Sequence, residues 1–350
     1  MSDHKDSLVG KNRRIIIVSA AVLILIFIVC LGLGSFRIPV VQTAKIIITH
    51  LFGLFHINLN LPETWTDKME TVIITVRFPR ILAAGLVGAS LALSGAVYQG
   101  IFKNPLVSPD LLGVSNGACV GAAVSILLGY TGLVTQFSAL VTGIVSVMIA
   151  ALIPRFFRNS SSLMLVLAGV IVSGFMSSLL GITKYVADPD DQLASIVFWT
   201  MGSFSTIRLR DVLIVLPAIA AAMVVVIIFR WRINILSLGD NEAKSMGINI
   251  KATRGILIVC STILTACAIC LSGTIGWVGL IIPHLGRLVI GQDNRFLIPT
   301  SGIFGAIFMI VVDTIARNLA VSEIPISILT GILGAPLFMI LLARQKARID

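Results

Sequence analysis

The sequence predicts an all-α integral membrane protein with about ten transmembrane helices. Of its 350 residues, 57% are apolar and only 12% are charged, whereas a soluble domain averages about 45–50% apolar and about 25% charged residues. The apolar residues form runs of about 20, the length of a membrane-spanning helix, and not the alternating segments of about ten found in membrane barrels. Because backbone groups in lipid have no water to bond, helices are the spanning structure that fits these runs.

The apolar runs predict ten spans, at residues 15–35, 76–100, 110–130, 133–154, 163–183, 211–230, 255–272, 276–291, 298–318 and 325–343. The first run follows Lys11, Arg13 and Arg14, and no small-residue cleavage site comes after it. We therefore expect it to be a retained span and not a signal peptide.

Basic residues predict the orientation of these spans. Ten spans place both termini on one side; if that side is the cytoplasm, the inner segments carry about two thirds of the 26 Lys and Arg residues, in agreement with the positive-inside rule. The net charge of +10 then reflects topology and not nucleic-acid binding, which would need a basic soluble face. We predict one transmembrane domain over 1–350, with cytoplasmic tails at 1–14 and 344–350 and a cytoplasmic loop at 230–254.

The cysteines and histidines show no metal-ligand pattern. All five Cys residues lie in apolar runs, and the Cys267-x-x-Cys270 pair has no nearby His or acid. Thiols in such surroundings pack as small apolar groups. We predict no metal site.

Two segments, 86–113 and 264–291, match at an offset of 178 residues. Both contain Leu-Ser-Gly, then nine residues, then Pro, and the matching residues include Ser94, Gly95 and Pro105 in the first copy and Ser272, Gly273 and Pro283 in the second. Transporters are commonly built from such repeats, so we expect an internal parallel repeat. Coincidence in an apolar chain is the alternative.

The sequence shows no motif by which the chain itself could couple transport to ATP hydrolysis or to an ion gradient. The sequence G-x-x-x-x-G-K-[ST] does not occur in it, so the phosphate-binding loop of an ATPase is missing. An ion-driven carrier would need ionisable groups near the middle of the membrane. Asp313 and Arg317, spaced to pair on one helix face, lie instead near the outer end of their span. An ATPase partner is therefore favoured over an ion gradient.

The loop at 230–254 contains a short amphipathic pattern at 238–247 that predicts a helix. Asp240 offers an N-cap carboxylate and Gly247 a C-terminal stop. Such a helix fits the groove of a partner protein. An ordinary polar loop is the alternative.

These segments resemble the FecCD-type permeases of bacterial type II ABC importers. The loop is similar to the family's G-D-x-x-A-x-x-x-G signature through Gly239, Asp240, Ala243 and Gly247. Matches continue in order from about residue 71 to residue 343 and include Ser94, Gly95, Asn104, Pro105, Gly273, Pro283, His284, Pro325 and Pro336. Trp277 and Asn294 stand where the family more often has Phe and His, which bears on substrate preference.

The resemblance implies a permease subunit with ten helices and defined partners. These are a second permease, expected to be identical, two ATPase subunits and an extracytoplasmic binding protein. ATP and Mg would be bound by the ATPases, so we expect no cofactor in this chain. The substrate would be an iron–siderophore chelate or haem, less often cobalamin. The ATPases would contact the loop residues Gly239, Asp240, Glu242, Ala243 and Gly247.

The resemblance also assigns residues to docking and gating. Arg77, Arg80 and Arg317 would receive acidic lobes of the binding protein, since Arg binds carboxylates through two parallel hydrogen bonds. The alternative is that they reach lipid head groups or pair locally. Ser161 and Ser162 would form a cytoplasmic gate, or belong to a plain loop. An ion-gradient carrier and a zinc or manganese permease, which needs His and carboxylate ligands, remain alternative functions.

Overall fold

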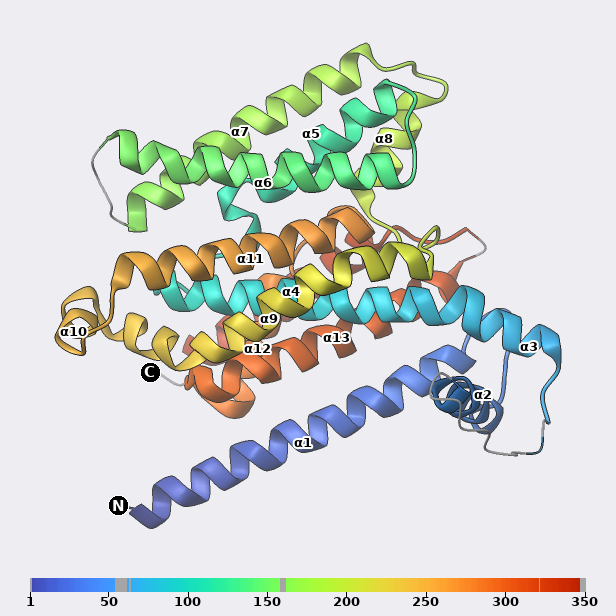
Figure 1. Ribbon diagram of the computed structural model, residues 1–350, viewed down its shortest axis with the longest axis horizontal. Coiled ribbons are helices and arrows are strands. Elements are labelled where there is room, and N and C mark those ends of the chain that lie inside the picture. The colour runs from blue at the N-terminus through green and yellow to red at the C-terminus, as the bar shows by residue number, and fades with distance from the viewer. Residues whose placement is uncertain (1, 54–61, 63, 158–161, 321, 347–350) are drawn as a thin grey trace.

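A computed structural model describes the chain except residues 1, 54–61, 63, 158–161, 321 and 347–350. The described part consists of helices joined by short connections (Figure 1). The elements are α1 Ser2–Gly32, α2 Val40–Gly53, α3 Asp67–Thr71, the π-helix η1 Val72–Arg77, α4 Phe78–Phe102, the 3₁₀ turn η2 Pro109–Leu112, α5 Val114–Leu127, α6 Leu133–Phe156, α7 Ser162–Val186, α8 Gln192–Met201, α9 Leu209–Leu238, α10 Asp240–Ser245, α11 Ile250–Ser272, α12 Val278–Ile290, α13 Asn294–Leu319 and α14 Ile326–Lys346. The predicted all-α fold is confirmed.

Each of the ten predicted spans falls on a helix. Seven helices in the described residues are long and apolar enough to cross a membrane, and shorter apolar helices occupy the third, eighth and tenth predicted spans. α5 has 14 residues and α12 has 13, so each is about 20 Å long and cannot cross a core of about 30 Å alone. The turn η2 before α5 and the segment before α12 are partly buried, with Pro109, Leu112 and Ile275 packed inside the bundle, where protein can satisfy backbone groups.

α4 lies at the centre of the bundle, surrounded by α9, α11, α12 and α13 (Figure 1). Its residues are buried almost without interruption from Pro79 to Ile101. A Cβ atom at Gly95 would lie 1.8 Å from the carbonyl oxygen of Gly279 on α12. Glycine is therefore required where these two helices touch, as expected for helices packed in lipid.

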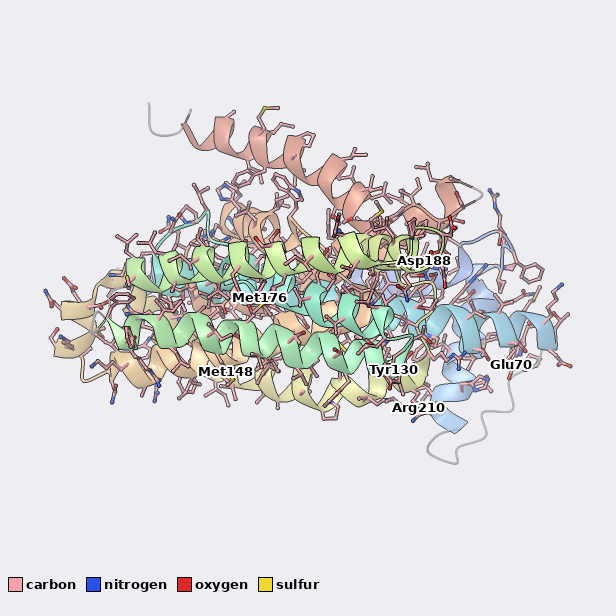
Figure 2. All side chains as sticks on the ribbon, turned by 90° about the horizontal axis from the view of Figure 1, so that it is seen from above. Glu70, Tyr130, Met148, Met176, Asp188 and Arg210 are labelled. Atoms are coloured by element: carbon pink, nitrogen blue, oxygen red, sulfur yellow. The ribbon has the colours of Figure 1, made fainter. Side chains whose placement is uncertain are left out.

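A second layer is formed by α5, α6 and α7, which pack mainly on one another (Figure 1). Apolar side chains cover the flanks of this layer, and Met148 and Met176 lie about midway along it (Figure 2). Asp188, Arg210 and Glu70 lie toward one end of the molecule in the same view. An apolar belt between polar ends is the distribution that a membrane imposes.

The two ends of the bundle carry different elements. The beginning of α1 lies at the same end as α10, whereas α2 and α3 lie at the opposite end (Figure 1). We call these the α10 end and the α2 end. Residues 2–14, predicted as a tail, continue the helix of the first span. The predicted loop at 230–254 is shorter than expected, because α9 extends to Leu238 and α11 begins at Ile250.

The two segments aligned at an offset of 178 residues have different structures. Ser94 and Gly95 lie within α4, whereas Ser272 and Gly273 form the end of α11, which runs opposite to α4 (Figure 1). Pro105 lies in a connection, whereas Pro283 lies inside α12. This register therefore does not relate equivalent elements, although Gly95 and Gly273 both lie at tight contacts.

Candidate functional site

The loop between α9 and α11 folds into the predicted short helix. α10 begins after Gly239 and ends at Ser245. The N–H of Gly247 donates to the carbonyl of Lys244 at 2.9 Å, and the N–H of Ile248 donates to that of Ala243 at 3.0 Å. Gly247 has a φ of 76°, the left-handed conformation that ends a helix in this hydrogen-bond pattern and favours glycine. Both glycines of the signature therefore mark the bounds of α10.

α10 is attached to the bundle by one face. Ala243 is fully buried against the neighbouring helices α9 and α11. An oxygen of the Asp240 carboxylate accepts a hydrogen bond from Arg254 on α11 at 3.0 Å. Asp240 was predicted as the N-cap, but Gly239 occupies that position and no side chain caps the helix. The carboxylate instead faces α11, where the guanidinium of Arg254 offers a charged partner.

The other face of α10 is open. Asn241, Glu242 and Lys244 are exposed. A short helix anchored on one side and charged on the other can transmit a push from a bound partner to α9 and α11. The residues predicted to contact an ATPase therefore divide into two kinds: Glu242 faces outward, whereas Ala243 and Asp240 hold the helix in place.

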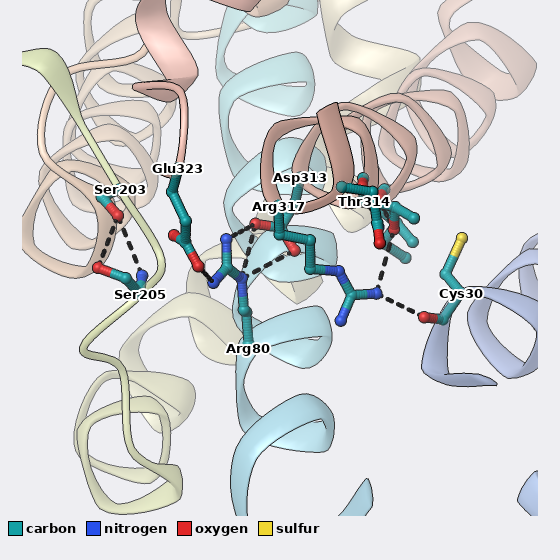
Figure 3. A network of polar contacts seen from close by, with 10 residues as sticks. Cys30, Arg80, Ser203, Ser205, Asp313, Thr314, Arg317 and Glu323 are labelled. Carbon is teal, nitrogen blue, oxygen red and sulfur yellow. Dashed lines mark hydrogen bonds and ion pairs between the residues drawn. The ribbon is translucent and has the colours of Figure 1, made fainter. Parts of the chain in front are cut away.

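At the opposite end, Arg80 ties α4 to α13 and to the segment before α14 (Figure 3). Its Nε and Nη2 atoms donate to Asp313 at 2.9 and 2.8 Å, and its Nη1 atom donates to Glu323 at 2.6 Å. Asp313 is fully buried and Arg80 is 7% exposed. The predicted pair of Asp313 with Arg317 is not formed, because the carboxylate points toward α4, where Arg80 supplies two donors in a fork.

Arg317 and Arg77 bond to the end of α1. Arg317 donates to the carbonyl of Cys30 and to the hydroxyl of Thr314 (Figure 3). Arg77 is 5% exposed and donates to the carbonyls of Leu31 at 2.9 Å, Gly32 at 3.2 Å and Phe36 at 2.6 Å. The last carbonyls of a helix have no partners within it, and these guanidinium groups provide them.

The three arginines predicted to dock a binding protein therefore all bond within the chain, and two of them are buried. Their docking role stays a prediction. Of the predicted gate, Ser161 lies outside the described residues, and Ser162 is the first residue of α7, whose side chain is not described.

Among the remaining signature residues, Ser94 and Gly273 lie at contacts between helices. The hydroxyl of Ser94 is within 3.1 Å of the carbonyl of Ser261 on α11. Gly273 has a φ of 71°, and a Cβ there would lie 2.3 Å from the carbonyl oxygen of Trp199. Pro325 directly precedes α14, and Pro336 lies inside it. These residues position helices and carry no reactive group.

Asn104, Pro105 and His284 converge on a cleft at the α10 end of the bundle. It has a volume of about 370 Å³ and is also lined by Gln99 and Arg287. Sequence reasoning had placed these residues in separate motifs about 180 positions apart. Only the packing of α4 against α12 shows that they share one cavity.

Comparison with known proteins gives a consistent result. The family model described as the FecCD transport family matches residues 22–344. The molybdate import system permease protein MolB of Haemophilus influenzae is 40% identical over 326 residues, covering 93% of this chain and 94% of the relative. A Helicobacter pylori protein named for an iron chelatin transport system permease is 39% identical over 282 residues, covering 80% and 85%.

A solved structure shows the same architecture. It is an inward-facing transporter assigned to the metal-chelate type of ABC transporters, with 38% identity and a TM-score of 0.83, and the match covers 95% of this chain and 99% of that one. The match extends over nearly the whole of both chains, so the two helical arrangements correspond throughout.

Proposed function

Since the chain belongs to the FecCD transport family of ABC importer permeases, we propose that two copies of it enclose a path across the membrane. Two separate ATPase subunits, which bind ATP and Mg, drive an iron chelate inward along this path. Haem, an iron chelate of a porphyrin, is included in the proposal. The substrate arrives on a binding protein at the α2 end. Both termini and α10 then face the cytoplasm.

The observation that carries the proposal is the structure of α10. It is a six-residue helix with a buried anchor, Ala243, and an exposed charged face that includes Glu242 and Lys244. Nothing within the chain covers this face in the described structure. Because α10 directly follows α9 and precedes α11 with few intervening residues, a displacement of α10 moves two helices of the bundle. An ATPase that grips α10 can thereby change the packing around α4.

The chemistry of the bundle favours a chelated metal over a bare ion. Zinc and manganese permeases need several His or carboxylate ligands along the path, and no group of three His, Cys, Asp or Glu residues converges within the described residues. A metal that travels inside an organic ligand needs no protein ligands. The iron chelatin relative from Helicobacter supports this substrate class, whereas the molybdate relative shows that a related path admits an oxyanion.

The structure gives little support to an ion-gradient carrier. That alternative assigned a switch to Asp313 and Arg317, but Asp313 is held by hydrogen bonds from both the Nε and the Nη2 atom of Arg80. A carboxylate fixed in a buried ion pair would have to leave it to take up a proton, and breaking such a pair costs several kcal/mol, roughly 3–5 kcal/mol. An ion pair between Arg80 and Asp313 that holds α4 against α13 is the better explanation of this site.

Reconstitution tests the proposal. The purified chain is placed in liposomes with or without its ATPase, ATP is supplied on the α10 side, and the binding protein is supplied outside. We expect uptake only with both partners present. Uptake by the chain alone, or uptake abolished by an uncoupler at constant ATP, would contradict the proposal.

The substrate is tested separately on the binding protein. Its thermal stability is measured with an iron–siderophore chelate, haemin, cobalamin and molybdate in parallel, because a bound ligand raises the unfolding temperature. A shift with the iron chelate or haemin supports the substrate proposal. A shift with molybdate or cobalamin alone would replace the substrate and leave the ATP-driven mechanism intact.

A further inference from the structure

A basic cleft opens at the α10 end of the bundle, where α4, α9, α12 and α13 meet. It encloses about 370 Å³, and its polar lining includes Gln99, Lys103, Asn104, Ser237, His284 and Arg287. We refer to it as the basic cleft. The motifs around Asn104-Pro105 and Pro283-His284 contribute to it, although the mechanism proposed above uses neither of them.

The charge of the basic cleft is positive and uncompensated. Lys103 and Arg287 line it, and no carboxylate is among the described residues that do. The nearest acid in the sequence, Asp293, is already bound by Arg295 at 2.7 Å and by Asn234 at 2.7 Å. A cleft with two cations and no anion is complementary to an incoming carboxylate or phosphate.

Two buried polar nitrogen atoms on residues that line the basic cleft lack partners. His284 is 5% exposed, and its Nδ1 atom has no hydrogen-bond partner. The same holds for the Nη1 atom of Arg287. A buried polar group without a partner costs about 1–3 kcal/mol, and such groups are rare in folded proteins. Two of them, on residues that line one cavity, indicate that a polar group from elsewhere completes the site.

The basic cleft lies next to α10. Ser237, which lines the cleft, is two residues before Gly239, so the last turn of α9 leads from the cleft directly to the proposed contact with the ATPase. A protein seated on α10 would cover the mouth of the cleft, and this makes a side chain of that protein the natural occupant. The guanidinium of Arg287 matches a carboxylate in shape and charge.

We propose that the basic cleft receives an acidic side chain of the ATPase subunit and forms a second contact beside α10. This inference rests on the proposed function, since it needs an ATPase at the α10 end. It assigns Arg287 and Lys103 as the ion-pairing residues and His284 as a further polar contact. The contact would link the ATPase to α4 and α12, whereas α10 packs mainly on α9 and α11.

Zero-length cross-linking tests the contact in the intact complex. A carbodiimide joins an amine to a carboxylate only when the two are in direct contact, and the Lys103 amine is available at the mouth of the cleft. We expect mass spectrometry to find Lys103 linked to an Asp or Glu of the ATPase. A link of Lys103 to residues of its own chain alone would count against the proposal.

Affinity measurements on variants test it independently. The affinity of the ATPase for the chain in nanodiscs is compared for the wild type, Arg287→Gln, Arg287→Lys and Lys103→Asn; Asn tolerates the left-handed backbone at position 103, where φ is 53°. We expect Arg287→Gln to weaken binding about tenfold or more, and Arg287→Lys to recover part of the loss. The control is Arg232→Gln, which removes an exposed charge from α9 outside the cleft.

The possible outcomes separate the two proposals. If the wild type binds no ATPase, the proposed function fails and takes this inference with it. If the wild type binds and both Arg287→Gln and Lys103→Asn bind equally well, only this inference fails. Retention of phosphate or an anionic lipid by the wild type but not by Arg287→Gln, with equal ATPase affinity, would assign the cleft to another anion and overturn the proposal. Gel filtration and thermal unfolding of each variant exclude misfolding as the cause.

Discussion

The two ends of the bundle use charged side chains in opposite ways. At the α2 end, Arg77 and Arg80 are buried and their donors bond to α1, α13 and the segment before α14. At the α10 end, Lys103, Glu242 and Lys244 are exposed, and no ion pair is found for them within the described residues. The buried arginines at the first end hold helices together, whereas the second end, besides the pairs Asp240–Arg254 and Asp293–Arg295, keeps these three charges available to a partner.

This difference has a consequence for how a movement would pass through the molecule. Helices tied at one end and free at the other can pivot about the tied end when the free end is displaced. The buried pair of Arg80 and Asp313 lies at the tied end, and α10 lies at the free end (Figure 1). Inward transport driven from the α10 end therefore needs the Arg80 cluster mainly as a fixed support.

The largest effect is expected from breaking that support. Arg80→Ala removes both donors from Asp313 and leaves a buried carboxylate without a partner, which costs roughly 3–5 kcal/mol. We expect a strong loss of folded protein, measured as the midpoint of thermal aggregation in detergent by fluorescence-detected gel filtration.

Two controls accompany Arg80→Ala. Glu323→Gln removes the charge of the half-exposed partner of Arg80. We expect it to lower the free energy of unfolding by less than about 1 kcal/mol. The double variant Arg80→Met with Asp313→Leu removes both charges, and we expect it to recover much of the lost stability, because apolar pairs can replace buried ion pairs. Equal destabilisation by all three variants would show that the cluster is not a tie of this kind.

The next largest effect is expected from a substitution in α10. It should lower transport without lowering the yield of folded protein. Ala243→Glu places a charge at a fully buried position and should detach α10 from α9 and α11. We expect ATP-driven uptake to fall about tenfold or more, because binding a partner across a displaced surface loses central contacts. The measurement is uptake in liposomes beside the thermal midpoint of the same preparation.

Asn241→Glu is the matched control for Ala243→Glu. It adds the same side chain two residues earlier on the exposed face of α10, where burial does not oppose it. We expect uptake to fall less than in Ala243→Glu, because the buried anchor of α10 is kept. If Asn241→Glu and Ala243→Glu lowered uptake equally, added charge and not lost anchoring would be the cause.

Removing the ion pair that anchors α10 should have a smaller effect. Asp240→Asn weakens the contact with Arg254. The Asp240 side chain is half-exposed, and exposed ion pairs contribute about 0.2–1 kcal/mol to folding stability. We expect a change of a few fold in uptake and little change in thermal stability. Lys244→Gln, which removes a charge from the same helix without an ion pair, separates anchoring from charge: equal losses would contradict an anchoring role for Asp240.

The sequence predicted regular features well and pairings poorly. Long apolar runs predict spans because lipid leaves a helix few alternatives, and the paired glycines around α10 predict its bounds because only glycine adopts the closing conformation easily. Asp313 shows the limit. Its helical spacing to Arg317 suggested a local pair, but its partner Arg80 lies 233 positions away, and no local pattern contains that information.

The basic cleft shows the same limit in another form. His284 and Asn104 were recognised as parts of motifs, yet their proximity depends on how α4 packs against α12, which is set by the close contact at Gly95. Sequence alone also did not indicate that Arg77 would bond to the end of α1, since the carbonyls it serves belong to backbone and carry no side-chain signal.

The smallest expected effect is that of pH on thermal stability through Asp293 at the α10 end. It contrasts with the large effect expected from the buried pair of Arg80 and Asp313 at the other end. Burial alone would raise the pKa of Asp293, but hydrogen bonds from Arg295 and Asn234 outweigh it and hold this pKa below its usual range. A lowered native pKa gives stability that is fully present above the unfolded pKa of about 4 and is lost only as the pH falls through the native value. We therefore expect this site to cause no change in the thermal midpoint between pH 7 and pH 5. Below about pH 4, the thermal midpoint of the wild type should begin to fall as the carboxylate is protonated. Asp293→Asn should lower the midpoint at neutral pH and remove that acid-dependent part of the loss. A wild-type transition centred above pH 5 that disappears in Asp293→Asn would show that the carboxylate is not stabilised as its hydrogen bonds indicate.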